Sequence, residues 1–227
     1  MPVILYNGSV IASSNGTIIH NKWGIDSELC KKILGIAINY DLRPLVYCVN
    51  HRILLGLEEK VFSLSKFNDV SVDLNGLRIN YLKKPEDLDI DSAVAILLYG
   101  ASSLSPFERN NLLTEIRKFV RANLFGDRIE ISPKNADKGV ALVELAKLLN
   151  WDLNRIMAVG DNINDKEMLE VAGISVALAN SPSEVTELAD YVTRHSFGSG
   201  VIEAIEYGII HEKWRVKQKI GKNQIST

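Results

Sequence analysis

The sequence predicts an α/β protein in two parts: an α+β part over residues 1–132, and part of a doubly wound, Rossmann-like parallel sheet over residues 133–227. In the first part, tight-turn signals separate short strands, and two helical patterns lie between them. In the second part, helical patterns alternate with strands such as IMAV and ISVAL, which are apolar at every position. Strands of that kind are typical of a parallel sheet that helices cover on both faces.

The composition is that of a folded protein without a strong charge bias. The 227 residues are 46% hydrophobic, enough for the core of one large domain or two small ones. A formal net charge of -2 gives no strong attraction to nucleic acid or to a membrane surface. The opening residues MPVILYNGSV lack the basic region of a signal peptide, and no run of about 18 apolar residues could span a bilayer. With two cysteines that suit a reduced compartment, Cys30 and Cys48, these features predict a cytoplasmic protein that binds neither nucleic acid nor membranes.

Turn-forming residues divide the beginning of the chain into strands. Residues 7–8 and 14–16 supply the positive φ angles of tight turns between the segments VILY, SVIAS and GTIIH. A helix is expected near residues 26–40, with Asp26 or Ser27 at its cap and apolar residues along one face. PLVYCV and RILLG follow as a strand pair.

The second helical pattern opens with a capping box. Residues 57–84 before it show no clear pattern, and AVAILLYG at 93–100 predicts an apolar strand. In SPFE at 105–108, a serine stands at the cap, a proline at the first helical position, and a glutamate three residues after the serine. RIEIS follows the helix as an alternating strand. The apolar side chains expected on the core face of this helix are those of Phe107, Leu112, Leu113, Ile116 and Val120.

Helix and strand alternate along the rest of the chain. The expected helices cover residues 138–149, about 165–172, 183–189 and 199–209, and the expected strands cover residues 155–159, 174–178 and 190–193. The segment FGSG at 197–200 is expected to break the chain before the last helix, and a phosphate cradle is the alternative. The histidines share no metal-ligand spacing; they are His20, His51, His195 and His211.

Two acids follow the strand that ends in IMAVGD. In a parallel sheet, ligands bind outside the carboxyl ends of the strands, where Asp161 lies. Gly160 lets the backbone turn sharply, and Asp165 follows one helical turn later and can face the same cleft. Two carboxylates and a nearby asparagine offer the hard oxygen ligands that suit Mg²⁺. Alternatively, Asp161 only caps the next helix, and Asp165 is a solvated acid in its first turn.

A lysine opens the helix that precedes this strand. Lys138, in NADKGVALVELAKLL, is expected at the ligand edge of the sheet and close to a helix N-terminus, where a phosphate would be attracted. The alternative is a surface lysine that merely starts a helix. A lysine and paired acids at successive strand ends together favour a phosphate and metal site.

These residues resemble the C-terminal half of a haloacid dehalogenase superfamily phosphatase of the Cof-like, type IIB branch. The lysine of KG matches the third motif of that family, and GDNIND matches its fourth motif, G-D-x-x-N-D. ALANSPSEV resembles the stretch in which an asparagine, here Asn180, lies near the phosphate. The front of the chain, from PVILYNGSVIASSNGTIIH to RIEISPKNADKG, resembles the cap domain of that branch and its return to the core.

The resemblance implies a role for each domain and for each of these residues. The cap, residues 1–132, would choose the substrate, and residues 133–227 would form the C-terminal portion of the core. Lys138 would neutralise the charge of the phosphate and the nucleophile. Asp161 and Asp165 would hold Mg²⁺, the expected cofactor, and Asn164 and Asn180 would orient phosphate and metal.

The nucleophile motif of the family is not found in place. That motif, D-x-D-G-[TS], follows an apolar strand, and its first aspartate attacks phosphorus; the Ser or Thr of the second motif is not found either. VIASSNGT carries the strand and the Gly-Thr, but Ser13 and Asn15 stand where the carboxylates should be, which predicts a hairpin turn. Asp89 and Asp91 precede their apolar strand, as loop acids or a strand cap would. We therefore expect that part of the core, with the nucleophile strand, is absent from this chain.

Two functions of different class remain. The first is a Mg²⁺-dependent phosphatase of small phosphorylated metabolites, of the sugar phosphate or phosphoglycolate type, impaired because the nucleophile is missing. The second is a catalytically inactive remnant or interaction module that binds Mg²⁺ or phosphate weakly, or pairs with a partner chain. Without the nucleophile strand the IMAV strand would be an unpaired apolar edge, which a second copy in a homo-oligomer or the missing core fragment would cover.

Overall fold

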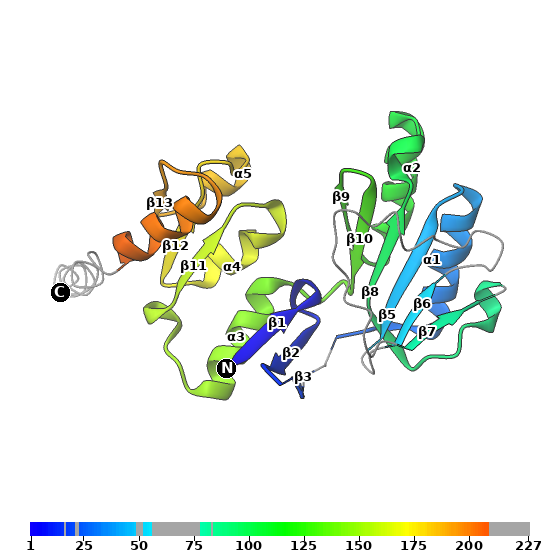
Figure 1. Cartoon of the computed structure of the whole chain (residues 1–227), viewed down its shortest axis with the longest axis horizontal. Coiled ribbons are helices and arrows are strands. Elements are labelled where there is room, and N and C mark those ends of the chain that lie inside the picture. The colour runs from blue at the N-terminus through cyan, green and yellow to red at the C-terminus, as the bar shows by residue number, and fades with distance from the viewer. Residues whose placement is uncertain (16, 21–22, 49–51, 56–77, 83, 209–227) are drawn as a thin grey trace, which may run out of the picture. The chain divides into compact units, whose positions relative to one another are not determined.

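The computed structural model describes residues 1–15, 17–20, 23–48, 52–55, 78–82 and 84–208. They form two compact units, one up to Ala136 and one from Asp137 onward, each with a hydrophobic core of its own (Figure 1). The division expected after residue 132 lies close to this boundary. The assignment of the two units as cap and core stays a prediction.

The first unit is built on a seven-stranded sheet in the order β7-β6-β5-β8-β10-β9, with β4 paired to β8. Strands β6 and β7 run parallel, and the other pairs are antiparallel. The strands are β4 (Ile25–Asp26), β5 (Arg43–Cys48), β6 (Arg52–Leu55), β7 (Arg78–Tyr81), β8 (Ser92–Tyr99), β9 (Arg121–Phe125) and β10 (Arg128–Ser132). The expected strand pair β5–β6 and the expected strands β8 and β10 are thus confirmed. Most of the unpatterned stretch 57–84 lies outside the described residues.

Helices α1 (Ser27–Asn39) and α2 (Pro106–Ile116) share one core with the strands of this sheet. Both begin at the caps that the sequence predicts. The Asp26 carboxylate accepts the N–H of Leu29 at 2.9 Å, and Ser105 and Glu108 form the expected capping box. Because the caps satisfy N–H groups that a helix leaves unpaired, they fix where each helix starts.

One residue predicted on the core face of α2 does not lie there. Phe107 is 74% exposed, whereas Leu112, Leu113 and Ile116 are buried. At about 100° per residue, nine residues place Phe107 on the side of the helix opposite to Ile116. Val120 is buried as expected, but it lies beyond the end of the helix.

A small antiparallel sheet opens the chain. Its strands are β1 (Pro2–Leu5), β2 (Val10–Ser13) and β3 (Ile18–His20), in the order β1-β2-β3. Apolar side chains of β2 and β3 pack against Val94 of β8 and Tyr47 of β5. The sheet thus forms part of the first unit.

The second unit contains a parallel sheet in the order β11-β12-β13. Its strands are β11 (Met157–Gly160), β12 (Ile174–Ala177) and β13 (Tyr191–Val192), and its helices are α3 (Lys138–Leu149), α4 (Lys166–Val171), α5 (Ser183–Thr186) and a C-terminal helix over residues 197–208. The C-terminal helix includes the segment 197–200, so FGSG does not break the chain before it. The bounds of α3 are those that the sequence predicts.

Helices cover both faces of this parallel sheet. On one face, side chains of α4 and α5 form a cluster with Ala158 and Ala177. On the other face, Ala204 of the C-terminal helix packs on Ile174 and Val176. The predicted α/β fold class is therefore confirmed, with β11 at one edge of the sheet in the part of the chain that is described. Within the same part, no helix is long and apolar enough to cross a membrane.

Candidate active site

The candidate site lies where β11 ends, as expected for a parallel sheet. The strand stops at Gly160, and a 3-10 turn (Ile163–Asp165) leads into α4. A Cβ atom at Gly160 would lie 2.5 Å from the Cβ of Asp165, a distance that side chains do not tolerate. Glycine at this position therefore allows Asp165 to sit against the end of the strand.

Asp165 is the centre of a charged network. The residue is 5% exposed, and its Oδ1 lies 2.6 Å from Nζ of Lys138. Its Oδ2 accepts the backbone N–H groups of Asp161 and Asn162 at 3.1 and 3.0 Å. A buried carboxylate requires such partners, because an unpaired charge in the protein interior is costly. Asp165 thus ties α3 to the loop that follows β11.

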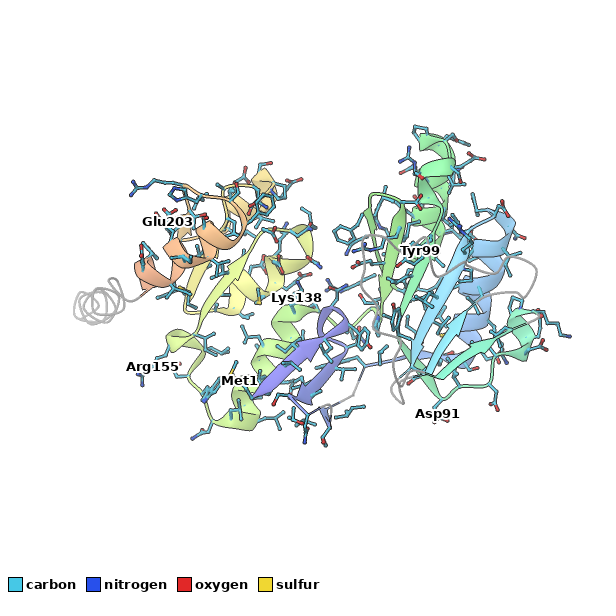
Figure 2. The ribbon with its side chains drawn as sticks, viewed as in Figure 1. Met1, Asp91, Tyr99, Lys138, Arg155 and Glu203 are labelled. Carbon is cyan, nitrogen blue, oxygen red and sulfur yellow. The ribbon has the colours of Figure 1, made fainter. Side chains whose placement is uncertain are left out.

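The start of α3 brings Lys138 within reach of Asp165. The Asp137 carboxylate caps this helix by accepting the N–H of Val140 at 2.7 Å. A Cβ atom at Gly139 would lie 2.3 Å from the carbonyl oxygen of Glu167, so α3 and α4 touch at their backbones. The Lys138 side chain, labelled in Figure 2, remains 29% exposed.

A second pair, Asn180 and Asp161, is connected to the Lys138–Asp165 pair through the Asp161 backbone. The Asn180 amide, in the loop after β12, donates from Nδ2 to Oδ2 of Asp161 at 2.9 Å. The Oδ1 of Asn180 in turn accepts the backbone N–H of Phe197 at 3.2 Å. These two bonds fix the orientation of the amide, and with it the carboxylate of Asp161. The structure thus joins four of the residues expected from the sequence in one hydrogen-bonded network: Lys138, Asp161, Asp165 and Asn180.

Asn164, the fifth expected residue, lies in the same 3-10 turn as Asp165. The residue that the sequence reasoning missed is Asn162. Its Oδ1 accepts the N–H of Ile163 at 2.9 Å, and it forms a capping box with Asp165. The three-residue spacing of Asn162 and Asp165 is the signal that could have identified this cap.

Two alternatives raised by the sequence are wrong. Asp165 is buried in an ion pair and is not a solvated acid. Lys138 is not merely a surface lysine that starts a helix, since its amine contacts that buried carboxylate. The residue that caps the 3-10 turn is Asn162, not Asp161.

The donors at this site fit a magnesium ion. Asp161 and Asp165 offer carboxylate oxygens, and Mg²⁺ is usually held by one or two carboxylates together with phosphate oxygens and waters. Over the described residues, no group of three or more His, Cys, Asp or Glu side chains could hold a metal ion by itself. His195 contacts Glu203, and His51 and His211 lie outside the described residues.

The two stretches that imitate the nucleophile motif both belong to the first unit. VIAS is strand β2, which pairs antiparallel with β3. At the end of β2, Ser13 N–H donates to the carbonyl of Thr17 at 2.8 Å, and Asn15 Oδ1 accepts the N–H of Thr17 at 3.1 Å. The predicted hairpin is confirmed. Asp89 and Asp91 are exposed and precede β8.

A parallel sheet with helices on both faces places the second unit in the Rossmann-like α/β class. The family model of the haloacid dehalogenase-like hydrolases matches residues 1–205 of the chain, which therefore belongs to that family. Among solved structures, an X-ray structure from Thermotoga maritima is similar with a TM-score of 0.68 at 28% identity, covering 88% of this chain and 73% of that chain. A sugar phosphatase of HAD subclass IIB is similar with a TM-score of 0.70 at 21% identity, covering 91% of this chain and 75% of that chain. The resemblance to the Cof-like branch is thus confirmed.

Curated relatives match a shorter stretch. The phosphoglycolate phosphatase of Methanosarcina mazei is 43% identical over 79 residues, which are 35% of either chain. The phosphoglycolate phosphatase of Methanoculleus marisnigri is 38% identical over 106 residues, 47% of this chain and 45% of that protein. In Bacillus subtilis, 5-amino-6-(5-phospho-D-ribitylamino)uracil phosphatase YcsE is 32% identical over 105 residues, 45% of this chain and 42% of that protein. The chain thus spans less than half the length of the curated relatives it matches.

Proposed function

We propose that this chain carries the magnesium- and phosphate-binding part of a phosphatase site for small phosphorylated metabolites. The observation that supports this most strongly is the ion pair of Lys138 and Asp165, 2.6 Å long, which shares one loop with the Asp161–Asn180 pair. Cation, carboxylates and amides then meet at the edge of the sheet where parallel α/β proteins bind ligands. The relatives named as phosphoglycolate phosphatases support a small phosphorylated metabolite as the substrate, and phosphoglycolate or a sugar phosphate is the class we propose.

Each residue has a proposed part. Asp161 would hold Mg²⁺, with Asp165 beside it, and the ion would supply charge neutralisation at the phosphate oxygens. Asp165 also holds the Lys138 amine, whose positive charge would attract the phosphate and offset the negative charge of the acids. Asn180 keeps the Asp161 carboxylate in one orientation, and Asn164 would orient phosphate and metal.

We further propose that this chain alone turns over little or no substrate. In the family that it resembles, an aspartate attacks phosphorus, and the attacking aspartate is followed by another that moves the leaving-group proton. The stretch that imitates this motif has Ser13 and Asn15 instead, in a hairpin where they bond to each other and to Thr17. A serine that lacks an adjacent base is a weak nucleophile. The alternative function, an inactive module that binds Mg²⁺ or phosphate, is supported by the same observation.

A phosphatase assay separates the two functions. The chain would be incubated with p-nitrophenyl phosphate and Mg²⁺, beside an Asp161→Ala variant and a matched Glu170→Gln variant of an exposed acid on α4. Turnover that is lost in Asp161→Ala and kept in Glu170→Gln supports the active enzyme. Mg²⁺ binding that depends on Asp161, without turnover, supports the binding module. If Asp161→Ala changes neither binding nor turnover, the proposed site is wrong.

A further inference from the structure

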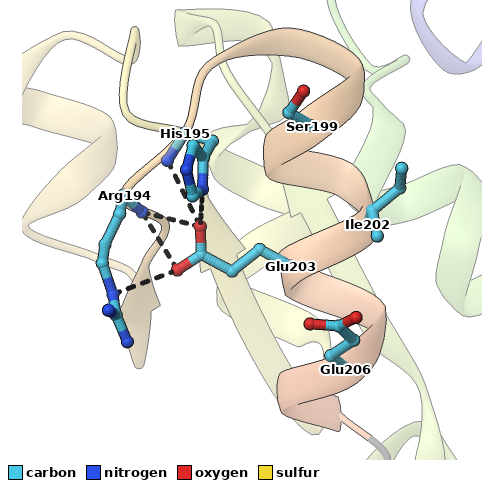
Figure 3. Close-up of a pocket in the computed structure, with 6 residues that line it drawn as sticks. All are labelled: Arg194, His195, Ser199, Ile202, Glu203 and Glu206. Atoms are coloured by element: carbon cyan, nitrogen blue, oxygen red, sulfur yellow. Dashed lines mark hydrogen bonds and ion pairs between the residues drawn. The ribbon is translucent and has the colours of Figure 1, made fainter.

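The C-terminal helix carries a carboxylate that the proposed site does not use. Glu203 has a side chain that is 16% exposed, and it borders a pocket of about 430 Å³ (Figure 3). The other residues that line this pocket are Arg194, His195, Ser199, Ile202 and Glu206. Figure 3 shows the Glu203 carboxylate turned toward the loop that precedes the helix. An acid in such a position can accept hydrogen bonds from that loop, residues 193–196.

Glu203 collects hydrogen bonds from this loop. The backbone N–H of Arg194 lies 3.1 and 3.0 Å from its two oxygens. The backbone N–H of His195 donates to Oε2 at 3.2 Å, and the ring Nδ1 of His195 lies 2.8 Å from the same oxygen. The hydroxyl of Tyr191 donates to Oε1. These bonds, that of Tyr191 foremost and then those of His195 and the two backbone N–H groups, lower the pKa of Glu203 to about 2. The carboxylate is therefore ionised at neutral pH.

The loop is tied in turn to the strand ends of the site. Thr193, which is 3% exposed, donates from Oγ1 to the carbonyl of His195 at 2.7 Å and accepts the N–H of Ala179 at 3.1 Å. A Cβ atom at Gly200 would lie 2.3 Å from the His195 carbonyl oxygen, so the helix rests directly on the loop. The residue after Ala179 is Asn180, which holds Asp161. The loop therefore contacts the residue that directly precedes Asn180.

The last link is the backbone of Phe197. Its N–H donates to Oδ1 of Asn180 at 3.2 Å, which leaves the Nδ2 end of the amide to face Asp161. Phe197 has a φ of 53°, in the left-handed region that residues other than glycine rarely adopt. Such a conformation persists only where the surrounding structure holds it in place. The bonds of Glu203 to residues 194 and 195 hold the chain just before it.

We infer that Glu203 is a positioning residue for the proposed cation site, acting through the loop on Asn180 and through Asn180 on Asp161. The inference rests on the proposed function, because it assigns Glu203 a part in that site. A carboxylate whose orientation is fixed loses less freedom when it binds a cation, and outer partners of metal ligands commonly tune metal affinity for this reason. Glu203 touches neither the substrate nor the metal in this scheme.

The test measures Mg²⁺ affinity by isothermal titration calorimetry of the full chain. We expect Asn180→Ala, which removes a direct partner of Asp161, to weaken Mg²⁺ binding about tenfold. Glu203→Ala, one step further from the ligand, should weaken Mg²⁺ binding measurably but less. We expect Glu203→Gln, which keeps one acceptor, to lie between wild type and Glu203→Ala. The matched control is Glu206→Ala, on the same helix and in the same pocket, which should bind Mg²⁺ like wild type. A second control, Ala204→Gly, weakens the same helix at a buried position without touching the carboxylate, and its Mg²⁺ affinity should also be unchanged.

A double variant distinguishes positioning from general support of the fold. If Glu203 acts through Asn180, Glu203→Ala adds no further loss of Mg²⁺ affinity in an Asn180→Ala background. The inference is overturned if the two losses multiply, if Ala204→Gly weakens Mg²⁺ binding as much as Glu203→Ala, or if Glu203→Ala binds like wild type.

A measurement on the metal-free chain tests the positioning role of Glu203 separately from the proposed function. The side-chain amide signals of Asn180, followed by NMR in the metal-free chain, should shift or broaden in Glu203→Ala and stay as in wild type in Glu206→Ala. Unchanged Asn180 signals in Glu203→Ala overturn the positioning role itself. If those signals respond as expected but wild type binds no Mg²⁺ through Asp161, the proposed function is wrong, and the part of Glu203 in cation binding is overturned with it.

Discussion

At the scale of single residues, the meeting of Lys138 with Asp165 depends on two glycines. Gly160 lets the turn that carries Asp165 approach the strand end, and Gly139 lets α3 and α4 touch at their backbones. A side chain at either position would collide with its neighbour at 2.5 Å or less. The ion pair then joins an aspartate side chain that is 7% exposed to a lysine side chain that is 29% exposed. The aspartate also accepts bonds from two N–H groups. Breaking such a pair leaves a buried charge without compensation.

Replacing the lysine tests this residue-scale reasoning. We expect Lys138→Met to lower the free energy of unfolding by about 2 kcal/mol, less than for a fully buried pair because the lysine side chain is partly exposed. The matched control is Lys147→Met on the same helix, whose ion pair with Glu144 involves a lysine that is 66% exposed. That change should cost at most about 0.5 kcal/mol. Urea unfolding of both variants at pH 7 makes the comparison. Equal losses of unfolding free energy would contradict the claim that the Lys138–Asp165 ion pair stabilises the protein more than the exposed pair does.

At the scale of secondary-structure elements, one carboxylate links two turns of the first unit. Asp127, in the turn between β9 and β10, accepts the N–H of Ser102 at 3.0 Å and the N–H of Gly100 at 3.3 Å, and it also accepts the Ser102 hydroxyl. These bonds link the hairpin to the 3-10 turn Ala101–Ser103, which follows β8. Burial by itself would raise the pKa of Asp127, but the hydrogen bonds from Ser102 and Gly100 outweigh it and lower that pKa below its ordinary value.

A lowered pKa makes this link dependent on pH. The folded protein binds the Asp127 proton less tightly than the unfolded chain does, so the contribution of the carboxylate is complete above about pH 5, beyond the ordinary value of about 3.9. It is lost as the pH falls through the lower pKa of the folded state. We expect Asp127→Asn to cost about 1 kcal/mol or less at pH 7, because Asp127 is exposed to solvent. The deficit should shrink toward pH 3 in urea unfolding. Asp91→Asn, at an exposed loop acid, is the control, and a deficit that grows on acidification would refute the assignment.

The bounds of a helix or strand can be predicted from local sequence patterns where a cap or a turn fixes its ends. The bounds of α3 match the prediction because Asp137 caps one end and Asn150, with a φ of 53°, ends the other. Elements without such signals came out shorter than predicted, as α5 did, since packing rather than pattern decides their ends. Phe107 shows the limit of counting apolar residues, because its angle around the helix turns it away from the core.

At the scale of the whole molecule, the sequence could predict the fold class and the residues at the strand end, but not their bonds. Lys138 and Asp165 were expected near each other because Lys138 opens the helix before β11 and Asp165 follows that strand, so that both fall at the ligand edge of one parallel sheet. Their direct contact, and the turn of the Asn180 amide toward Asp161, depend on backbone approaches that only coordinates give. The bonds of Glu203 to Tyr191 and to residues 194 and 195 have no sequence signature, because most of them end on backbone N–H groups.

The central claim is that a divalent cation and a phosphate share one pocket formed by Lys138 and the two acids. Titration of Mg²⁺ into the chain by calorimetry, with and without inorganic phosphate, tests it most directly. If the ligands share the pocket, phosphate tightens Mg²⁺ binding in wild type by several-fold, and by linkage Mg²⁺ tightens phosphate binding by the same factor. We expect this coupling to vanish in Lys138→Met and Mg²⁺ binding to be lost in Asp161→Asn, with Glu170→Gln as the unchanged control. Mg²⁺ affinity that is the same with and without phosphate in wild type would contradict the account.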